Sequence, residues 1–404
     1  MNEPDKSFAP EEGLEYAVSL LRKADFAAVD LPDIFPDLGI GERETLDLLA
    51  PNVLGCAARL DQPYALAHMD PPTPWITWAL ALWNARLNQN LLHPATAPFA
   101  LESEKLVVEW LIPFFGMNGG HMCSGSTLAN LTALWAARDG KGIKKIIASE
   151  AAHLSIKKAA KILGLPCEEI ATDNQGKMLL EKLGDLSEAC LVLTAGTTST
   201  GAIDPLELAG EAKWTHIDAA WAGSLRLSPT HANLLVGIDA ADSIAVSAHK
   251  WLFQPKESAL IMFREPEIAN SAISYGGGYL ATPNIGVQGS RGAVAIPLLA
   301  TMIAWGREGI AERIDRTMKM ANQLAQALDE EDKISLWAMP KTGINVFRPL
   351  TCSTEEFYQC LPEGMFSTCN LNHQTWLRSV AVNPLANIEE IISIVRKVIR
   401  EHNA

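Results

Sequence analysis

The sequence lacks three features that would place the protein in a membrane, in an oxidising compartment or on nucleic acid. It has no run of 18 apolar residues, so we expect no membrane span. Its seven cysteines are an odd number, widely spaced and without a CxxC pair, which argues against a disulfide framework or a zinc site. Basic residues are fewer than acidic ones. The net charge of −14 argues against nucleic acid and anionic membrane surfaces as partners.

The chain also begins without the features of a secretory signal, because residues 1–6 are polar and include two acidic side chains. Together with the scattered thiols, this predicts a soluble cytoplasmic protein that holds no metal. The composition is 48% hydrophobic and 20% charged, which is typical of a globular protein. A length of 404 residues suffices for one large domain and a smaller one.

Proline and glycine divide the chain into regions. They interrupt residues 28–63 repeatedly, which predicts an N-terminal arm with short helical pieces over residues 1–72. We expect a large α/β domain over residues 73–288. Linking helices and a small α+β domain are expected over residues 289–404.

Short apolar runs alternate with helical patterns in the second half of the expected large domain. Predicted strands cover residues 144–148, 168–171, 189–194, 214–217, 243–247 and 258–263, and predicted helices cover 154–163, 177–184 and 205–212. This alternation indicates the α/β class, with a mostly parallel central sheet and helices on both faces. Ligands of such sheets bind at the carboxyl ends of the strands.

Two of the predicted strands end in side chains of opposite charge. Lys250 follows the strand at 243–247, and Asp218 closes the strand at 214–217. A buried lysine is costly unless it is paired or used chemically, and a desolvated amine is a good nucleophile for an aldehyde. A lysine for the aldehyde and a carboxylate for the ring nitrogen are what pyridoxal 5′-phosphate (PLP) requires. The alternative is an ordinary surface His-Lys pair.

A small, hydroxyl-rich segment precedes the predicted helix at 128–138. Residues 119–127 include three glycines, and Ser126 and Thr127 stand directly before the helix. Free N–H groups and a partial positive charge at a helix start attract phosphate, and small residues allow a close approach. The segment is therefore a candidate phosphate site or, alternatively, an ordinary helix cap.

Three further side chains have both a functional and a structural interpretation. His153 opens a predicted helix and would stack on a pyridine ring, or would be a helix-terminal or core histidine. Thr197 belongs to a hydroxyl-rich loop that would contact the cofactor or cap itself. Arg378 lies in an otherwise apolar strand, as a clamp for a substrate carboxylate or as a structural ion pair. For Trp75 and Trp78, on a predicted helix, we expect core packing.

Taken together, these residues resemble the group II PLP-dependent amino acid decarboxylases, from about His68 to the C-terminus. The similarity is carried by the segments His216 to Gly223 and Ser247 to Trp251. That family includes glutamate, aromatic amino acid, diaminobutyrate and archaeal tyrosine/aspartate decarboxylases. The resemblance implies the fold type I architecture of PLP-dependent transferases and a homodimer with the active site at the subunit interface.

The resemblance also implies a role for each matching residue. Lys250 would carry the cofactor aldehyde, Asp218 would face the ring nitrogen, and His153 would stack on the ring. Arg378 would hold the substrate α-carboxylate, and His68, where the similarity begins, would also contact the substrate. The remaining residues expected to contact the cofactor are Ser126, Thr127, Thr197, Ala220, Ser247 and His249.

The catalytic loop departs from the family pattern. Tyr279 matches its beginning, but only nine residues separate it from Gly289. Many relatives have a longer loop with a tyrosine that returns a proton to the α-carbon. No such tyrosine stands in this loop, so Tyr275, Tyr279 or another group would have to substitute.

We therefore predict PLP-dependent decarboxylation of an L-amino acid to its amine. With the loop tyrosine missing, a different lyase, an aminotransferase or a decarboxylating aldehyde synthase is the alternative. A binding or structural subunit that keeps only the fold is a third interpretation, against which the joint presence of Lys250, Asp218 and His153 argues.

Overall fold

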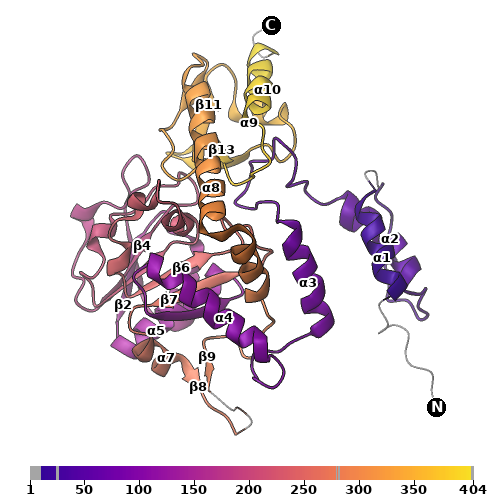
Figure 1. The fold of residues 1–404 in the computed structure, drawn as a ribbon. Helices are drawn as coiled ribbons and strands as arrows, with labels where there is room; N and C mark the ends of the chain where they lie inside the picture. The colour runs from indigo at the N-terminus through magenta and orange to yellow at the C-terminus, as the bar shows by residue number, and fades with distance from the viewer. Residues whose placement is uncertain (1–10, 24–26, 279, 281–282, 402–404) are drawn as a thin grey trace, which may run out of the picture. The chain divides into compact units, whose positions relative to one another are not determined.

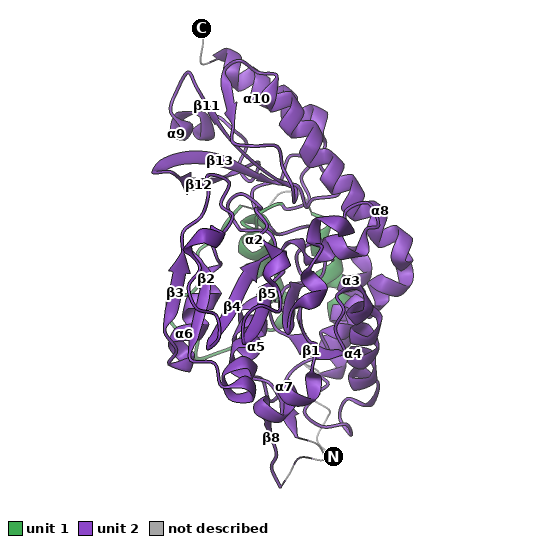
Figure 2. Cartoon of the chain, turned by 90° about the vertical axis from the view of Figure 1, so that its left-hand side faces the viewer, with its two compact units in different colours: residues 1–59 green, residues 60–404 purple. Residues whose placement is uncertain are grey.

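The computed structural model describes residues 11–23, 27–278, 280 and 283–401. It separates two compact units, residues 1–59 and residues 60–404, which Figure 2 distinguishes by colour. The domain limits expected after residues 72 and 288 remain predictions. Within the described ranges, no helix is both long and apolar enough to cross a membrane.

The first unit contains two helices, α1 (Glu11–Leu21) and α2 (Glu42–Gly55). The Tyr16 hydroxyl on α1 donates a hydrogen bond to the Asp47 carboxylate on α2. Asn52 accepts from the main-chain N–H of Val29 at 3.0 Å and donates to its carbonyl oxygen at 2.8 Å. Within residues 28–63, where short helical pieces were expected, the described structure contains α2.

The second unit is built on a seven-stranded sheet. Its strands, in spatial order, are β1 (Gly119–Cys123), β7 (Ala259–Phe263), β6 (Ser243–Ser247), β5 (Trp214–Asp218), β4 (Ala189–Thr194), β2 (Lys145–Ser149) and β3 (Cys167–Ile170). Strand β7 runs antiparallel to both of its neighbours, whereas all pairs from β6 to β3 are parallel. The predicted mostly parallel sheet is confirmed.

Helices cover both faces of this sheet, as Figure 1 shows. Because successive side chains of a strand point to opposite faces, Ile146 and Ile147 on β2 belong to different cores. Ile146 packs with the helices of one face, and Ile147 with those of the other. The first face carries α5 (Ser126–Lys141), α6 (Leu154–Leu163) and α7 (Pro266–Ile273), and the second carries α4 (Pro98–Leu111) and the first half of α8 (Ala295–Asp329).

A second, antiparallel sheet stands at the C-terminal end of the chain (Figure 1). Its strands are β10 (Ile334–Leu336), β11 (Ile344–Pro349), β13 (Gln374–Val380) and β12 (Ser367–Leu371). The second half of α8, α9 (Thr354–Gln359) and α10 (Ile388–Glu401) complete this region. Helix α8 has a kink at Gly306, where φ is 61°.

Two predicted helices are wrong. Residues 177–184 and 205–212 contain only the 3₁₀ turns Leu180–Lys182 and Leu206–Leu208. In the first segment Met178 forms a β-bridge with Thr172, which uses main-chain groups that a helix would need. In the second, Gly210 has φ +89°, which is incompatible with a continuing right-handed helix.

The packing expected for the tryptophans of α3 (Trp75–Leu87) is also wrong. Trp75 is 72% exposed and Trp78 is 59% exposed. The pattern is apolar on several sides of the helix, so the sequence alone does not show which side faces the core.

Candidate active site

Residues from several separate segments of the second unit line one cavity. It lies where β4, β5 and β6 end at the carboxyl edge of the sheet, as the parallel topology predicts. Lys250 and Asp218, which follow or close two adjacent strands, both line it. The full lining is Met69, Ser126, His153, Thr194, Gly196, Thr198, Asp218, Ala220, Trp221 and Lys250.

The Lys250 amine is held by a tight turn after β6. Its main-chain N–H donates to Ser247 O at 3.3 Å, and its carbonyl accepts from Phe253, whose φ is +58°. Burial lowers the pKa of Lys250, although the nearby Asp218 carboxylate acts in the opposite direction. A larger neutral fraction makes the amine more nucleophilic at neutral pH.

Asp218 is buried at the end of β5, and two donors hold its carboxylate. The side-chain amide of Asn130 donates to Oδ2 at 2.9 Å, and the main-chain N–H of Ala220 donates to Oδ1 at 3.1 Å. The pattern Asp218-Ala219-Ala220 thus turns the chain back so that residue 220 supports the carboxylate. Both bonds fix the orientation of the carboxylate.

Sequence reasoning missed Asn130, Ser155 and His216, which surround these groups. Asn130 lies one helical turn beyond Ser126, so both point from the same side of α5. That spacing was one signal in the sequence, and the position of His216 two residues before Asp218 on β5 was another. The partners of Asn130 come from distant parts of the chain, and no local pattern links them to it.

The cavity fits a phosphate-bearing aldehyde cofactor. Close to Lys250, several buried side-chain atoms have no hydrogen-bond partner in the described structure, although such groups are normally paired. They are Thr194 Oγ1, Ser247 Oγ, His249 Nδ1 and Ser258 Oγ. The start of α5 adds unpaired N–H groups at Ser126 and Thr127, where an anion is favoured.

The histidine beside the lysine is neutral. Burial lowers the pKa of His249 to about 4, with the Lys256 and Lys250 charges acting in the same direction. A neutral ring with a free Nδ1 is available to bond a group in the site. Lys256 itself pairs with Asp70.

Two other predicted contacts have different surroundings. Thr197 Oγ1 accepts from the main-chain N–H of Ala202 at 3.1 Å and bonds Thr200 Oγ1 at 3.0 Å, so the loop-capping interpretation describes this hydroxyl. Thr127 is exposed on the first turn of α5. Cofactor contacts of Thr197 and Thr127 remain predictions.

Arg378 projects from β13 and is 9% exposed. Its Nε donates to Ser367 Oγ at 3.1 Å, Nη1 to Thr198 O at 2.9 Å and Nη2 to Ala67 O at 3.2 Å. No carboxylate among the described residues forms an ion pair with it, so the structural ion pair is not observed. Thr198 lines the cavity, which places this positive charge at its edge.

The remaining predicted residues lie outside the cavity. His68 is exposed, between Ala67 and Met69 of the chain. Tyr275 begins the hairpin of β8 (Ser274–Tyr275) and β9 (Asn284–Ile285) and stacks on Trp135 at 5.9 Å, in the third turn of α5. It is not among the side chains that line the Lys250 cavity. Tyr279 lies outside the described residues.

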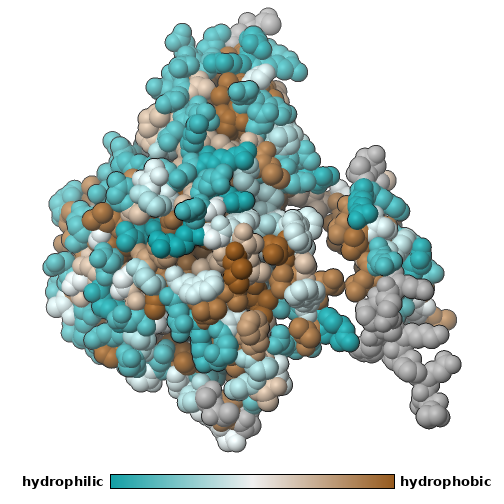
Figure 3. Space-filling model, in the orientation of Figure 1, coloured by the Kyte–Doolittle hydropathy of each residue, from teal (hydrophilic) through white to brown (hydrophobic). Residues whose placement is uncertain are grey.

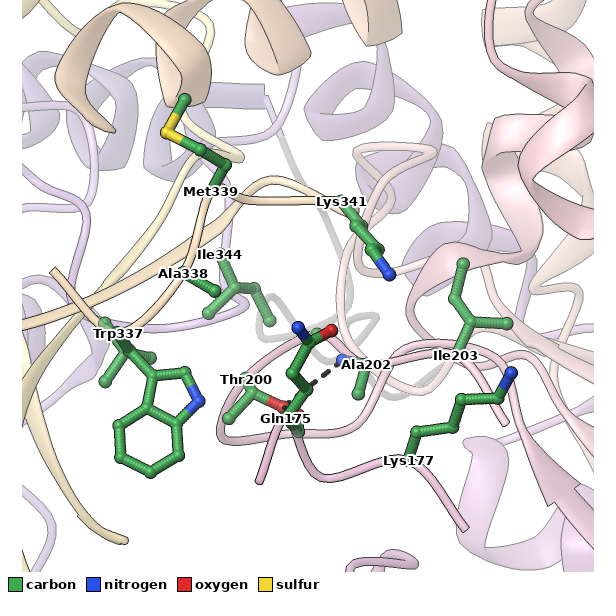
Figure 4. Close-up of a pocket in the computed structure, with 12 residues that line it drawn as sticks. Gln175, Lys177, Thr200, Ala202, Ile203, Trp337, Ala338, Met339, Lys341 and Ile344 are labelled. Atoms are coloured by element: carbon green, nitrogen blue, oxygen red, sulfur yellow. Dashed lines mark hydrogen bonds between the residues drawn. The ribbon is translucent and has the colours of Figure 1, made fainter. Parts of the chain in front are cut away.

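A second groove in the same unit has a different chemistry (Figure 4). It lies between the loops at residues 175–177 and 200–203 and the segment 337–346. Lys177 and Lys341 are on the opposite side from Trp337 in Figure 4. Its lining contains neither an acidic residue nor a histidine, so it lacks the acid–base groups of the first cavity.

Comparison with known proteins agrees with this geometry. The model for the pyridoxal-dependent decarboxylase conserved domain matches residues 49–349. An L-2,4-diaminobutyrate decarboxylase of Rhizobium meliloti is 31% identical over 364 residues, covering 81% of this chain and 73% of the relative. An aspartate 1-decarboxylase of Aliivibrio fischeri is 30% identical over 348 residues, covering 71% of this chain and 63% of the relative.

The solved structures agree on the fold. Mouse CSAD superposes with a TM-score of 0.86 at 20% identity, over 98% of this chain and 99% of the other. The glutamate decarboxylase domain of a Vibrio parahaemolyticus protein gives a TM-score of 0.82 at 21% identity, covering 99% of this chain and 97% of the other. The chain has the fold type I architecture, and it belongs to the family of pyridoxal-dependent decarboxylases, enzymes that use PLP as cofactor.

Proposed function

We propose that this enzyme removes the α-carboxylate of an L-amino acid as CO₂ and releases the amine. One observation carries the proposal. The amine of Lys250 and the carboxylate of Asp218 line a single cavity, and at its edge Arg378 has no carboxylate partner in the described structure. An arginine in that state is suited to bind a substrate carboxylate.

Each part of the cofactor has a matching group in the cavity. Lys250 would hold the aldehyde, Asp218 the protonated ring nitrogen and the start of α5 at Ser126 the phosphate. His153 and the small residue Ala220 would flank the ring. When bound, PLP supplies an electron sink for the charge left on the α-carbon as CO₂ departs.

The chain's own residues would then position the substrate and supply a proton. Arg378 would orient the α-carboxylate, and its three hydrogen bonds hold the guanidinium in place beforehand. The α-carbon needs a proton after CO₂ leaves. The titratable side chains that line the cavity are Lys250, His153 and Asp218, and since Asp218 is assigned to the ring nitrogen, Lys250 and His153 are the proposed proton donors within one chain.

The substrate side chain is best sought among those of the relatives. L-aspartate, L-2,4-diaminobutyrate and aromatic amino acids appear in the names of relatives. The test is CO₂ release from each of these and from the other standard amino acids, with PLP added. If no amino acid releases CO₂ while the protein binds PLP, the proposed reaction is wrong.

A decarboxylating aldehyde synthase is the second candidate, favoured by the short loop and by the position of Tyr275. Tyr275 is stacked on Trp135 and does not line the cavity of its own chain. Product analysis separates the two outcomes, because decarboxylation alone yields an amine. An aldehyde with consumption of oxygen would support the alternative instead.

We further propose that two copies of the chain form a homodimer. Figure 3 shows hydrophobic atoms gathered over α4 and the first half of α8. Several exposed apolar side chains extend this surface onto α3, and such patches are usually covered by a partner. The exposed apolar side chains of this surface are Trp75, Trp78 and Trp83 on α3, Trp110 on α4 and Ile303 on α8.

Light scattering after size exclusion tests the dimer. The double variant Trp78→Glu/Ile303→Asp should shift the mass towards the monomer, because it places charge in the apolar surface. Leu385→Asp, which alters an exposed apolar residue in the C-terminal region, is the control and should leave the mass unchanged. A wild-type monomer would refute the dimer.

We also propose a cytoplasmic location for the protein, and the free cysteines support it.

A further inference from the structure

Asn130 connects the two sides of the proposed cofactor site through one side-chain amide. The residue is completely buried on α5, next to the cavity but not part of its lining. Its Nδ2 donates to Asp218 Oδ2 and to Ser155 Oγ, both at 2.9 Å. Its Oδ1 bonds His216 Nε2 at 3.0 Å. Both N–H groups and the carbonyl are therefore used.

The partners determine which end of the amide is which. An ionised carboxylate only accepts hydrogen bonds, so the atom that faces Asp218 has to be the nitrogen. The oxygen then faces His216, whose Nε2 has to carry a proton. Burial lowers the pKa of His216 to about 4, so its ring is neutral and Nδ1 is an acceptor for the Ser243 hydroxyl at 2.9 Å.

The same reasoning extends to His153 through Ser155. The main-chain N–H of Ser155 donates to His153 Nδ1 at 3.3 Å, which shows that Nδ1 is an acceptor. Ser155 Oγ, 2.8 Å from the same atom, accepts from Asn130 and donates its own proton to Nδ1. Because Nδ1 accepts hydrogen bonds, the ring is neutral with its proton on Nε2, and burial, which lowers the pKa of His153, acts in the same direction.

We propose that Asn130 is a positioning residue for both sides of the cofactor site. Its amide holds the Asp218 carboxylate towards the ring nitrogen and, through Ser155, fixes His153 in the Nε2–H tautomer. The proposal rests on the site assignments made above, and it does not depend on which amino acid is the substrate. Asparagine suits this place because it offers two donors and one acceptor in a single plane.

The experiment compares three variants by two readouts that need no turnover. ¹⁵N-edited NMR of the histidine rings in the cofactor-free protein reports the tautomers. PLP affinity is measured by quenching of tryptophan fluorescence, since Trp221 lines the cavity. Asn130→Ala removes both connections, and Ser155→Ala removes only the one to His153. Asn345→Ala removes a buried amide that donates to Ala321 O in the C-terminal region and serves as the control.

The expected pattern is distinct for each variant. Asn130→Ala should change the ring signals of both His153 and His216 and weaken PLP binding by about tenfold or more, the effect of one lost bond to a charged group. Ser155→Ala should change His153 alone. Asn345→Ala should lower thermal stability and leave both readouts as in the wild type.

Either of two results would overturn the proposal. One is His153 ring signals that are unchanged in Ser155→Ala, which removes the hydroxyl bond to Nδ1 but keeps the main-chain one; this result is informative even where Asn130→Ala does not fold. The other is a folded Asn130→Ala protein that is less stable but binds PLP within about twofold of the wild type. A wild-type protein that binds PLP without releasing CO₂ would instead contradict the proposed reaction and leave this inference standing.

Discussion

Replacing Arg378 by methionine should weaken substrate binding but change the stability of the fold only slightly. Methionine keeps an unbranched apolar stem but removes the charge and all five N–H donors. In the structure three of these donors bond Ser367 Oγ, Thr198 O and Ala67 O. No carboxylate of the described chain neutralises the guanidinium, which is the state expected of a group that awaits an anionic ligand.

Opposing effects keep the change in stability small. Three lost hydrogen bonds cost about 0.5–1.5 kcal/mol each, and one of them leaves the carbonyl of the buried Ala67 unpaired. In return the variant no longer buries an unneutralised charge, which costs several kcal/mol in real proteins. Burial lowers the pKa of Arg378, which shows that the site disfavours the charged form. We expect the free energy of unfolding to change by no more than about 2 kcal/mol in either direction.

The effect on substrate binding has no such compensation. A hydrogen bond to a charged group contributes about 1.5–3 kcal/mol, so substrate affinity should fall by about 10- to 150-fold. The product amine lacks the α-carboxylate and should bind the variant as well as the wild type. Substrate KM and product inhibition constants, measured on the same preparations, provide this comparison.

Arg348→Met is the matched control. Arg348 lies on the neighbouring strand β11, over the ring of Trp376, and does not line the cavity. It should leave the KM unchanged. The reasoning is refuted if Arg378→Met weakens substrate and product alike, or if it lowers the unfolding free energy by more than about 4 kcal/mol without changing the KM.

Three further predictions concern stability. Burial lowers the pKa of Lys250 below its ordinary 10.5. At a pH between the lowered pKa and 10.5, the amine is protonated in the unfolded chain but neutral in the folded, cofactor-free protein. The free energy of unfolding should therefore rise with pH in this window. Urea unfolding near pH 7 and pH 10 should show this gain for the wild type but not for Lys250→Met. Burial raises the pKa of Asp204 from 3.8 to about 6, so stability should fall by up to about 3 kcal/mol as the pH rises through that window. Asp204→Asn should flatten the slope, and an unchanged slope would contradict the assignment. Gly201→Ala places a Cβ 2.2 Å from Thr342 Oγ1 at φ +71°, whereas Gly142→Ala has φ +65° and open space. Denaturant unfolding should show a loss of about 2–4 kcal/mol for the first and about 1–2 kcal/mol for the second, and equal losses would argue against the clash.

The strands and their ends were accessible from the sequence because they depend on neighbouring residues. An apolar run that ends in Asp218 or Lys250 is a local pattern, and parallel topology then brings such ends to one edge. The pattern did not reveal β1, because a five-residue strand with two glycines reads as a loop. It also assigned helices to 177–184 and 205–212, where tertiary bonds hold the main chain in turns.

The solvent exposure of the α3 tryptophans could not be predicted from the sequence in the same way. Helical spacing shows that Trp75 and Trp78 have apolar neighbours, but burial depends on what packs against the helix. An apolar side chain that faces a partner has the same sequence pattern as one that faces the core.

The sequence by itself determined the chemistry of this protein: an amine and a carboxylate at two adjacent strand ends, a helix start for a phosphate and an arginine within a strand. Only the tertiary structure decided what holds those groups. Arg378 is anchored by a carbonyl 311 residues away, and Asn130 reaches Asp218 across 88 residues. Local patterns encode strands and turns because these depend on adjacent residues. Hydrogen bonds between distant segments depend on how the whole chain packs, and no spacing in the sequence records them.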